Sequence, residues 1–220
     1  MPAVKWLEVQ FPPVFVQEIN QYIDDVVIPN NKDYSDKLVG QLKGEKSAQL
    51  DFPLKGHETG EQFKKVLENL GKSFVQKPYN RMSSVECFEC WTVHSYEGDY
   101  NPLHDHGVRT QSGLSCILYL KVPDSIKNKP EVEVPNLNHA SGVIDGWTQF
   151  QWGANTMKDI YQLREQTQHV VRPVEGKLLM FPCWLNHMVW PFKGEGERRT
   201  LSANFNIHDS PEVTKQFAER

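Results

Sequence analysis

Short β-prone segments, each ending at a turn, follow one another from residue 85 onward and constrain the fold more than any other feature of the chain. Each is five to nine residues long and rich in aliphatic and aromatic side chains, and the segments are Val85–Val93, Leu114–Val122, Trp147–Trp152, Gln168–Arg172, Lys177–Phe181 and Thr200–Ile207. Leu114–Val122 is almost continuously apolar, which is typical of a strand that is buried on both faces. Asp145-Gly146, directly before Trp147, predicts a hairpin turn. Many short strands separated by turns predict a β-sandwich or a barrel.

Helical periodicity lies mostly in the first third of the chain. Apolar residues recur at helical spacing from Val14 to Val27, and Pro29 is expected to end that helix. A second helix is predicted to begin at the capping-box spacing of Thr59 and Gln62 and to end at Pro78. We therefore expect about two helices to pack against the β-rich core.

These patterns predict a single domain over residues 1–220 that is mainly β with flanking helices. Residues 1–80 are expected to form a mostly helical support, residues 85–207 the β core, and residues 208–220 a solvated C-terminal segment. Residues 124–138 are rich in Lys, Pro, Glu and Asn and are expected to form a long surface loop. A length of 220 residues with a hydrophobic fraction of 39% is sufficient for one sizeable core.

Charge and composition argue against several classes of protein. The formal net charge is −4, so there is no basic surplus to favour a nucleic-acid backbone. The sequence holds no uninterrupted apolar run of the roughly 18 residues that a membrane span needs, and Met1–Trp6 lacks the character of a signal peptide. Four cysteines do not make a disulfide framework. We expect a cytoplasmic enzyme that binds neither nucleic acid nor membranes.

The stretch Gly98–Gly107 contains a pair of histidines, His104 and His106. Residues two apart in an extended strand point to the same face, where neutral imidazoles can chelate a divalent metal ion. The spacing alone is weak evidence, because eight histidines in 220 residues produce such pairs by chance. A polar loop at a strand end is the alternative interpretation.

His187 is a third candidate ligand. It follows an apolar segment that ends in Phe181-Pro182, and its neighbours are Trp184, Met188, Val189 and Trp190. Burying an imidazole costs free energy unless the ring is hydrogen-bonded or coordinated. His187 is therefore either a metal ligand or a hydrogen-bonded core residue.

A polar stripe is predicted near the end of the β core, where Arg198, Thr200, Ser202 and Asn204 would share one face of a strand. A guanidinium inside an apolar barrel needs an anionic partner, because an unpaired buried charge is very costly. The planar fork of arginine binds a carboxylate at two points. The alternative is that this face is exposed to solvent.

Taken in order, these motifs resemble the iron(II)- and 2-oxoglutarate-dependent dioxygenases. That family carries a His-x-Asp/Glu pair, a distant His and an Arg-x-Ser/Thr on a double-stranded β-helix, which is a jelly-roll or cupin-like fold. The resemblance covers about Trp91 to Ile207. It is closest to the prolyl-hydroxylase-like branch, in which a Tyr-Leu strand follows the first motif, as Cys116–Leu120 does here. The chain is also similar to 2-oxoglutarate oxygenases of bacteria and marine phages in which the first motif reads His-x-His.

The resemblance implies that Fe(II) binds His104, His106 and His187. The family usually has Asp or Glu where this chain has His106. A set of three imidazoles is chemically feasible, although it lacks the carboxylate that offsets the charge of the metal. Asp105 is the other candidate for that position, provided that a local bulge turns it toward the metal.

The resemblance also implies that Arg198, with Thr200 and Tyr119, holds the distal carboxylate of 2-oxoglutarate. Tyr96 is a further candidate for supporting the co-substrate. The implied reaction couples oxidative decarboxylation of 2-oxoglutarate by O2 to hydroxylation of a small molecule or a peptide, with prolyl residues as one target. Ascorbate is an implied assay additive, and neither the substrate nor the oligomeric state follows from the sequence.

Two other functions remain open at this point. A cupin-like metalloenzyme would use the three histidines without 2-oxoglutarate, and a catalytically silent binding module would keep only the fold. Cys87 and Cys90 have zinc-site spacing, but the two further ligands such a site needs have no matching spacing. Trp147 and Trp152 are candidates for a substrate mouth or for core packing.

Overall fold

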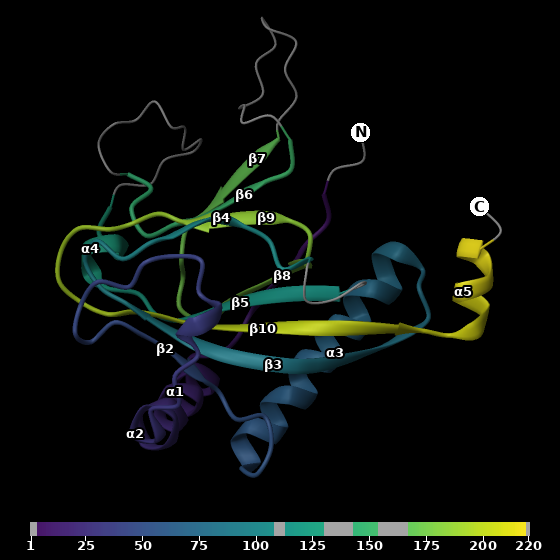
Figure 1. Cartoon of the computed structure of the whole chain (residues 1–220), viewed down its shortest axis with the longest axis horizontal. Helices are drawn as coiled ribbons and strands as arrows, with labels where there is room; N and C mark the ends of the chain where they lie inside the picture. The colour runs from purple at the N-terminus through teal and green to yellow at the C-terminus, as the bar shows by residue number, and fades with distance from the viewer. Residues whose placement is uncertain (1–3, 108–112, 130–142, 154–166, 219–220) are drawn as a thin grey trace, which may run out of the picture.

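The computed structural model of the chain describes residues 4–107, 113–129, 143–153 and 167–218. Within these residues the strands form two antiparallel sheets (Figure 1). The first sheet has the order β1-β8-β5-β10-β3-β2, and its strands are β1 (Leu7–Gln10), β8 (Lys177–Pro182), β5 (Gly113–Lys121), β10 (Arg198–Asp209), β3 (Ser83–Ser95) and β2 (Ala48–Asp51). The second sheet has the order β4-β9-β6-β7, and its strands are β4 (Asn101–His104), β9 (Asn186–Val189), β6 (Thr148–Gln151) and β7 (Gln168–Val171).

The chain passes repeatedly between the two sheets. Strands β3, β5, β8 and β10 belong to the first sheet, and the intervening β4, β6, β7 and β9 belong to the second. This alternation winds a pair of facing antiparallel sheets into a double-stranded β-helix, so the predicted fold class is confirmed. The two sheets face each other, and helices α1 (Pro13–Tyr22) and α3 (Glu58–Tyr79) lie on the outer side of the first sheet (Figure 1).

Apolar packing occurs in two clusters, one on each side of the first sheet. The outer cluster joins the helices to the sheet and includes Ile19, Phe63, Leu67, Leu118, Leu178 and Leu201. The inner cluster lies between the sheets and includes Ile117, Tyr119, Phe150, Leu179 and Phe181. Strand β5 supplies residues to both clusters, and from Gly113 to Leu120 its residues are buried. This double burial confirms the interpretation of its continuous apolar pattern.

Helix α3 (Glu58–Tyr79) packs along the first sheet through Phe63, Leu67 and Phe74. The predicted capping box is wrong: His57 is the N-cap, and its Nδ1 accepts a hydrogen bond from the Thr59 backbone N at 3.3 Å. Gln62 instead donates to Glu58 one turn earlier. The helix also continues past Pro78, and Asn80, with a left-handed φ of 47°, ends it.

The predicted helix from Val14 to Val27 is observed as three consecutive helical segments. They are α1 (Pro13–Tyr22), the π-helical η1 (Ile23–Val27) and the short α2 (Ile28–Asn30). Asn31, with a left-handed φ of 43°, is the C-cap that ends the last of these segments, two residues after Pro29. Two short segments in this region were not predicted as strands. Both β1 and β2 add to edges of the first sheet, so residues 1–80 provide more than helical support.

Three other predictions differ from the structure. Residues 143–146 form a turn before β6, but β6 pairs with β7 and β9 rather than closing a hairpin at Asp145-Gly146. The predicted loop at 124–138 begins with the helix α4 (Asp124–Lys127), and its residues 130–138 lie outside the described part. The C-terminal segment forms a helix, α5 (Pro211–Ala218). Among the described residues, none of the helices combines the length and apolar character needed to cross a bilayer.

Candidate metal centre and anion pocket

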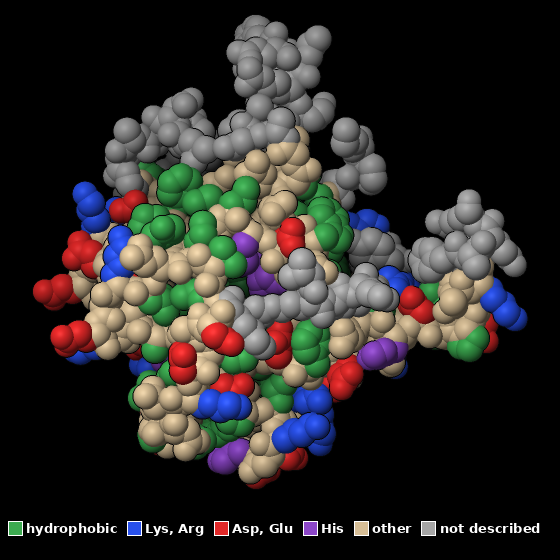
Figure 2. All heavy atoms as spheres, in the orientation of Figure 1, with side chains coloured by type: hydrophobic (Ala, Val, Ile, Leu, Met, Phe, Trp, Pro, Cys, Tyr) green, Lys and Arg blue, Asp and Glu red, His purple; other side chains and the backbone are tan. Residues whose placement is uncertain are grey.

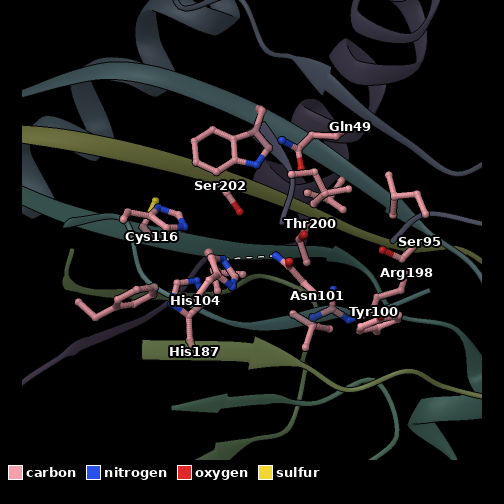
Figure 3. Close-up of a pocket in the computed structure, with 18 residues that line it drawn as sticks. Gln49, Ser95, Tyr100, Asn101, His104, Cys116, His187, Arg198, Thr200 and Ser202 are labelled. Carbon is pink, nitrogen blue, oxygen red and sulfur yellow. Dashed lines mark hydrogen bonds between the residues drawn. The ribbon is translucent and has the colours of Figure 1, made fainter. Parts of the chain in front are cut away.

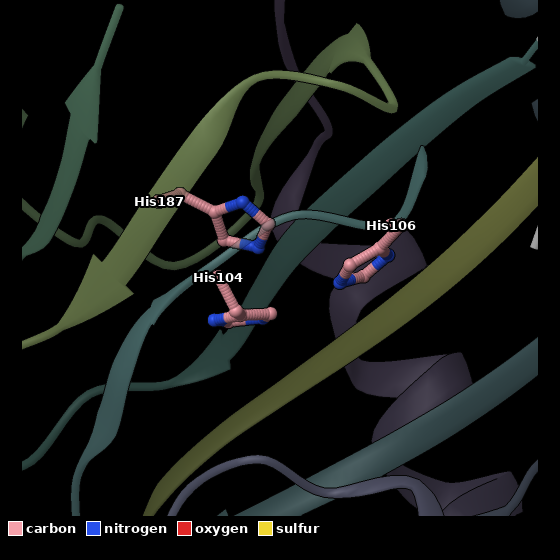
Figure 4. A group of neighbouring side chains, drawn as sticks. All are labelled: His104, His106 and His187. Atoms are coloured by element: carbon pink, nitrogen blue, oxygen red, sulfur yellow. The ribbon is translucent and has the colours of Figure 1, made fainter. Parts of the chain in front are cut away.

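Three histidines come together between the two sheets (Figure 4). His104 is the last residue of β4 and pairs directly with His187 of β9. His106 follows β4, where its backbone N donates to the Cys183 carbonyl at 2.8 Å. One ring nitrogen from each histidine lies within 4.8 Å of the other two. These residues form the only such metal-binding group of His, Cys, Asp and Glu within the described ranges.

The second ring nitrogen of each histidine already has a partner. Nδ1 of His104 lies 2.7 Å from the Pro102 carbonyl oxygen, and Nδ1 of His187 lies 3.0 Å from the Leu185 carbonyl oxygen. Nδ1 of His106 lies 2.7 Å from Oδ1 of Asn204. Because these oxygens only accept hydrogen bonds, each Nδ1 carries the hydrogen, and Nε2 is the ring nitrogen that can act as a metal ligand.

Burial keeps the deepest of these rings neutral. His187 is 4% exposed, and Phe181 packs against its ring at 5.0 Å between centroids. Burial, together with the neighbouring His104 and His106, lowers the pKa of His187 well below its ordinary value. A neutral imidazole is the form that binds a metal. With one ring nitrogen of each histidine close to the other two, the group fits a divalent transition-metal ion.

Asp105 lies outside this group. Its side chain is exposed, and its carboxylate accepts a hydrogen bond from the Gly107 backbone N at 3.0 Å. The structure thus brings His106, rather than Asp105, to the other two histidines.

The histidines open into a pocket between the sheets that extends along β10 (Figure 3). Arg198, Thr200 and Ser202 line this pocket from alternate positions of that strand, with Arg198 farthest from the histidines. Arg199 points to the opposite face, where it pairs with Glu197 and Asp24. Histidine side chains are visible near the middle of the molecular surface in an opening bordered by hydrophobic groups (Figure 2).

Arg198 is buried without a carboxylate partner in the described part of the chain. Its side chain is 2% exposed, its Nε donates to the Gly146 carbonyl at 2.9 Å, and its Nη2 lies 3.5 Å from Oγ1 of Thr148. Of the five N–H groups of a guanidinium, the other three have no partner among the described residues. Burial lowers the pKa of Arg198, and the neighbouring Tyr119 opposes that change. This cation requires an anion at the end of the pocket.

The Asp145-Gly146 turn shapes the arginine site rather than a hairpin. Gly146 has a φ of 72°, and a Cβ there would lie 2.3 Å from Cδ1 of Ile126. Only glycine fits this position, and the turn presents its carbonyl to Arg198.

The other predicted co-substrate residues occupy different positions. Tyr119 lies next to Arg198, with the guanidinium 5.4 Å from the ring centroid, and its hydroxyl donates to Thr148 at 2.7 Å. It supports the arginine but does not line the pocket. Tyr96 also does not line the pocket, and burial, followed by the charge of Glu197, raises its pKa.

Sequence reasoning missed several residues that line the pocket, among them Leu38, Leu42, Gln49, Tyr100 and Asn101. Asn101 is the first residue of β4, three residues before His104, and its Nδ2 is 3.4 Å from Nε2 of His104. The leucines come from a segment that crosses the pocket, where Gln41 forms a bridge with Tyr100. No sequence motif marks these residues, because long-range packing alone places them here.

The cysteines and tryptophans that drew attention in the sequence belong mainly to the core. Cys87 and Cys90 are buried and free, and burial raises the pKa of both thiols. Trp147 is 4% exposed within the inner apolar cluster. Trp152 packs against the ring of Trp6 with centroids 6.1 Å apart.

Comparison with known families decides the class of protein. Residues 89–204 match the family model described as "Putative 2OG-Fe(II) oxygenase". The chain belongs to this family of 2-oxoglutarate- and Fe(II)-dependent oxygenases. The matched residues include the histidine group and the buried arginine, and Fe(II), 2-oxoglutarate and O2 are the metal, co-substrate and oxidant of the family. Comparison with curated proteins gives no match.

Solved structures share the fold of this oxygenase at low sequence identity. A prolyl-4-hydroxylase from Pseudomonas putida is 15% identical, with a TM-score of 0.53 and 94% of each chain covered. The carbocyclase SnoK from nogalamycin biosynthesis is 10% identical, with a TM-score of 0.61, and 99% of this chain and 86% of that chain are covered. HygX from Streptomyces hygroscopicus, solved with nickel, 2-oxoglutarate and hygromycin B, is 12% identical, with a TM-score of 0.53 and coverage of 92% and 82%.

Proposed function

We propose that His104, His106 and His187 hold the catalytic Fe(II) through their Nε2 atoms. The proposal rests on the convergence of one ring nitrogen from each histidine and on the hydrogen bonds that engage the three Nδ1 atoms elsewhere. Fe(II) bound there would supply the oxidative chemistry that consumes O2 and 2-oxoglutarate. The protein orients the ligands and surrounds them with apolar side chains.

The observation that carries the function is the buried guanidinium of Arg198, which has no carboxylate partner among the described residues. It lines the same pocket as the histidines, and it offers three N–H donors to an anion. In this proposal the distal carboxylate of 2-oxoglutarate binds Arg198 and the hydroxyl of Thr200, and the 2-oxo acid end points toward the histidines. Tyr119 and Thr148 keep the guanidinium in place.

The reaction proposed is hydroxylation of a C–H bond in a small molecule or a peptide, coupled to formation of succinate and CO2 from 2-oxoglutarate. Structural neighbours that share the fold include a prolyl-4-hydroxylase and an enzyme solved with hygromycin B bound, which supports a screen of both peptides and small molecules. The need for an anion at Arg198 favours this reaction over a metalloenzyme that does not use 2-oxoglutarate.

The experiment is succinate formation from 2-oxoglutarate with Fe(II), O2 and ascorbate. Substrates are screened among proline-containing peptides, amino acids and small metabolites, and products are detected by the mass of one added oxygen atom. Wild-type protein should form succinate, while His187→Ala and Arg198→Met should lose nearly all turnover. Equal succinate formation by Arg198→Met would contradict the co-substrate site, and metal binding without any succinate would favour the cupin-like alternative.

A further inference from the structure

The hydrogen-bond partner of His106 differs from those of the other two histidines. His104 and His187 each donate to a backbone carbonyl close in sequence. His106 instead donates to the side-chain oxygen of Asn204, at 2.7 Å and 98 residues away. The ring that replaces the usual carboxylate ligand is therefore oriented by a side chain of β10.

Asn204 has no freedom to turn its amide around. It is fully buried, and its Nδ2 donates to Oε1 of Glu89 at 2.5 Å. Its Oδ1 accepts from the hydroxyl of Ser115 at 2.7 Å in addition to His106. Because an ionised carboxylate only accepts hydrogen bonds, Glu89 fixes the amide nitrogen on its own side and the amide oxygen toward His106.

Strand register holds these groups in a row. Asn204 of β10 lies opposite Glu89 of β3 on one side and opposite Ser115 of β5 on the other. The second oxygen of Glu89 accepts a hydrogen bond from the hydroxyl of Tyr34. A continuous chain of hydrogen bonds thus runs from Tyr34 through Glu89 and Asn204 to the ring of His106.

We propose that Glu89 and Asn204 are positioning residues that make His106 a metal ligand in place of the usual carboxylate. Asn204 fixes the hydrogen of His106 on Nδ1, so that Nε2 faces the metal. Glu89 fixes Asn204 and places a negative charge two hydrogen bonds behind the metal. Carboxylate partners of ligating histidines orient the ring and raise its basicity, and here an amide stands between the two groups. The inference rests on the proposed metal site.

Zn(II) alone is the probe, because it is diamagnetic and does not require turnover. Its affinity is measured by competition with a chelator for wild type, Asn204→Ala, Glu89→Ala and Glu89→Gln. Asn204→Ala should weaken binding about 10- to 100-fold, and Glu89→Ala should weaken it about 10-fold. Glu89→Gln keeps an acceptor oxygen for Asn204 and should recover part of that loss. Glu86→Gln, an exposed partner of His208 on the same strand, is the matched control and should bind as wild type does.

The tautomer of His106 provides a second measurement. A general loss of stability would affect all three histidines, whereas loss of the positioning contact should affect His106 alone. In Zn(II)-loaded wild type, long-range ¹H–¹⁵N spectra should show the hydrogen of His106 on Nδ1 in slow exchange with solvent. In Glu89→Ala that resonance should exchange faster, while those of His104 and His187 stay as in wild type, since backbone carbonyls hold them.

The outcomes separate this inference from the function on which it rests. If wild type binds Zn(II) and His187→Ala does not, but Glu89→Ala and Asn204→Ala bind as wild type, the positioning role is wrong and the metal site stands. If wild type fails to bind Zn(II), the metal site itself is wrong. Should either alanine variant fail to fold, a His106 resonance in wild type that is not on Nδ1 would overturn the proposal.

Discussion

Two neighbouring arginines on β10 show how strongly one residue's environment decides its role. The Arg199 side chain ion-pairs with Glu197 and Asp24 and donates to Asn20, so its charge is satisfied within the fold. Arg198 faces the other way into the pocket, where it donates to the Gly146 carbonyl and contacts the Thr148 hydroxyl. Strand alternation alone separates the two, and a register shift by one residue would exchange them.

Arg198→Met should abolish most 2-oxoglutarate binding and leave metal binding nearly unchanged. A methionine fills similar volume but offers no donor, and loss of a buried charge-assisted contact costs on the order of 2–5 kcal/mol. Calorimetric titration of the metal-loaded protein with 2-oxoglutarate measures the change. Arg198→Lys keeps the charge without the planar fork and should bind with intermediate affinity. Metal affinity that falls together with 2-oxoglutarate affinity would show that the two sites are not separate.

At this scale, sequence alone can indicate residues whose chemistry is unusual for their position. The His-x-His pair, the histidine among apolar residues and the arginine in a β-prone segment all have this property. Glu89 does not, since its importance comes from its hydrogen bonds with Tyr34 and with Asn204 of β10, which lie far away in the chain. Tyr96 does not line the pocket, and its role toward the co-substrate stays a prediction.

At the scale of elements, Glu197 joins the edge of β10 to its neighbours. It accepts from Arg199 and from Lys121 of β5, and its Oε1 lies 2.7 Å from Nδ1 of His94 in β3. Arg199 in turn contacts Asn20 of α1 and Asp24 of η1. The network therefore fastens the first helices to the outer face of the sheet.

Protonation of Glu197 at low pH should remove the stabilisation that this network contributes. Burial alone would raise the pKa of Glu197, but hydrogen bonds from His94 and Arg199 outweigh it and hold the pKa at about 2. Because the folded pKa lies below the unfolded value, the stabilisation is present above about pH 4.5 and is lost as pH falls toward 2, on the order of 3 kcal/mol in total. Glu197→Gln should flatten the acid limb of stability measured by urea unfolding. Glu18→Gln, an exposed change on α1, should leave that limb as in wild type.

Elements were predictable where local pattern and packing agree. The long apolar β5 and the amphipathic α3 have patterns that extend over several turns or pleats, and both are found near their expected places. Strands β1, β2, β4 and β9 are four residues each, and long-range pairing rather than local propensity makes them strands. The capping-box prediction failed because His57, an uncommon N-cap, caps the helix two residues earlier than Thr59.

For the whole molecule, the outer apolar cluster indicates that helices and β core fold together. Leu67 of α3 is fully buried among residues of α1 and of strands β5, β8 and β10. Leu67→Ala should lower the free energy of unfolding by about 2–5 kcal/mol. Thermal unfolding followed by circular dichroism and by tryptophan fluorescence should give one coincident transition in both proteins, shifted downward in the variant. Separate transitions for the two probes would show that the helices and the β-helix are distinct folding units.

The order of the motifs was enough to indicate the overall architecture through the family resemblance. The double-stranded β-helix also places the two ends of its core side by side. β10 pairs with β3 over nearly its whole length, although the two strands lie more than 100 residues apart. The arginine stripe of β10 and the histidines of the second sheet then line one pocket between the sheets. Sequence spacing cannot show this contact, since only the register of the completed sheet brings the residues together.

The central claim is that one chain binds one Fe(II) through three histidines and then binds 2-oxoglutarate at Arg198. Anaerobic equilibrium dialysis of purified protein with Fe(II) and labelled 2-oxoglutarate tests it most directly. Wild type should retain one Fe(II) and one 2-oxoglutarate per chain, His187→Ala should retain neither at the same concentrations, and Arg198→Met should retain Fe(II) alone. Retention of Fe(II) by His187→Ala, or of 2-oxoglutarate by Arg198→Met, at wild-type levels would contradict the account.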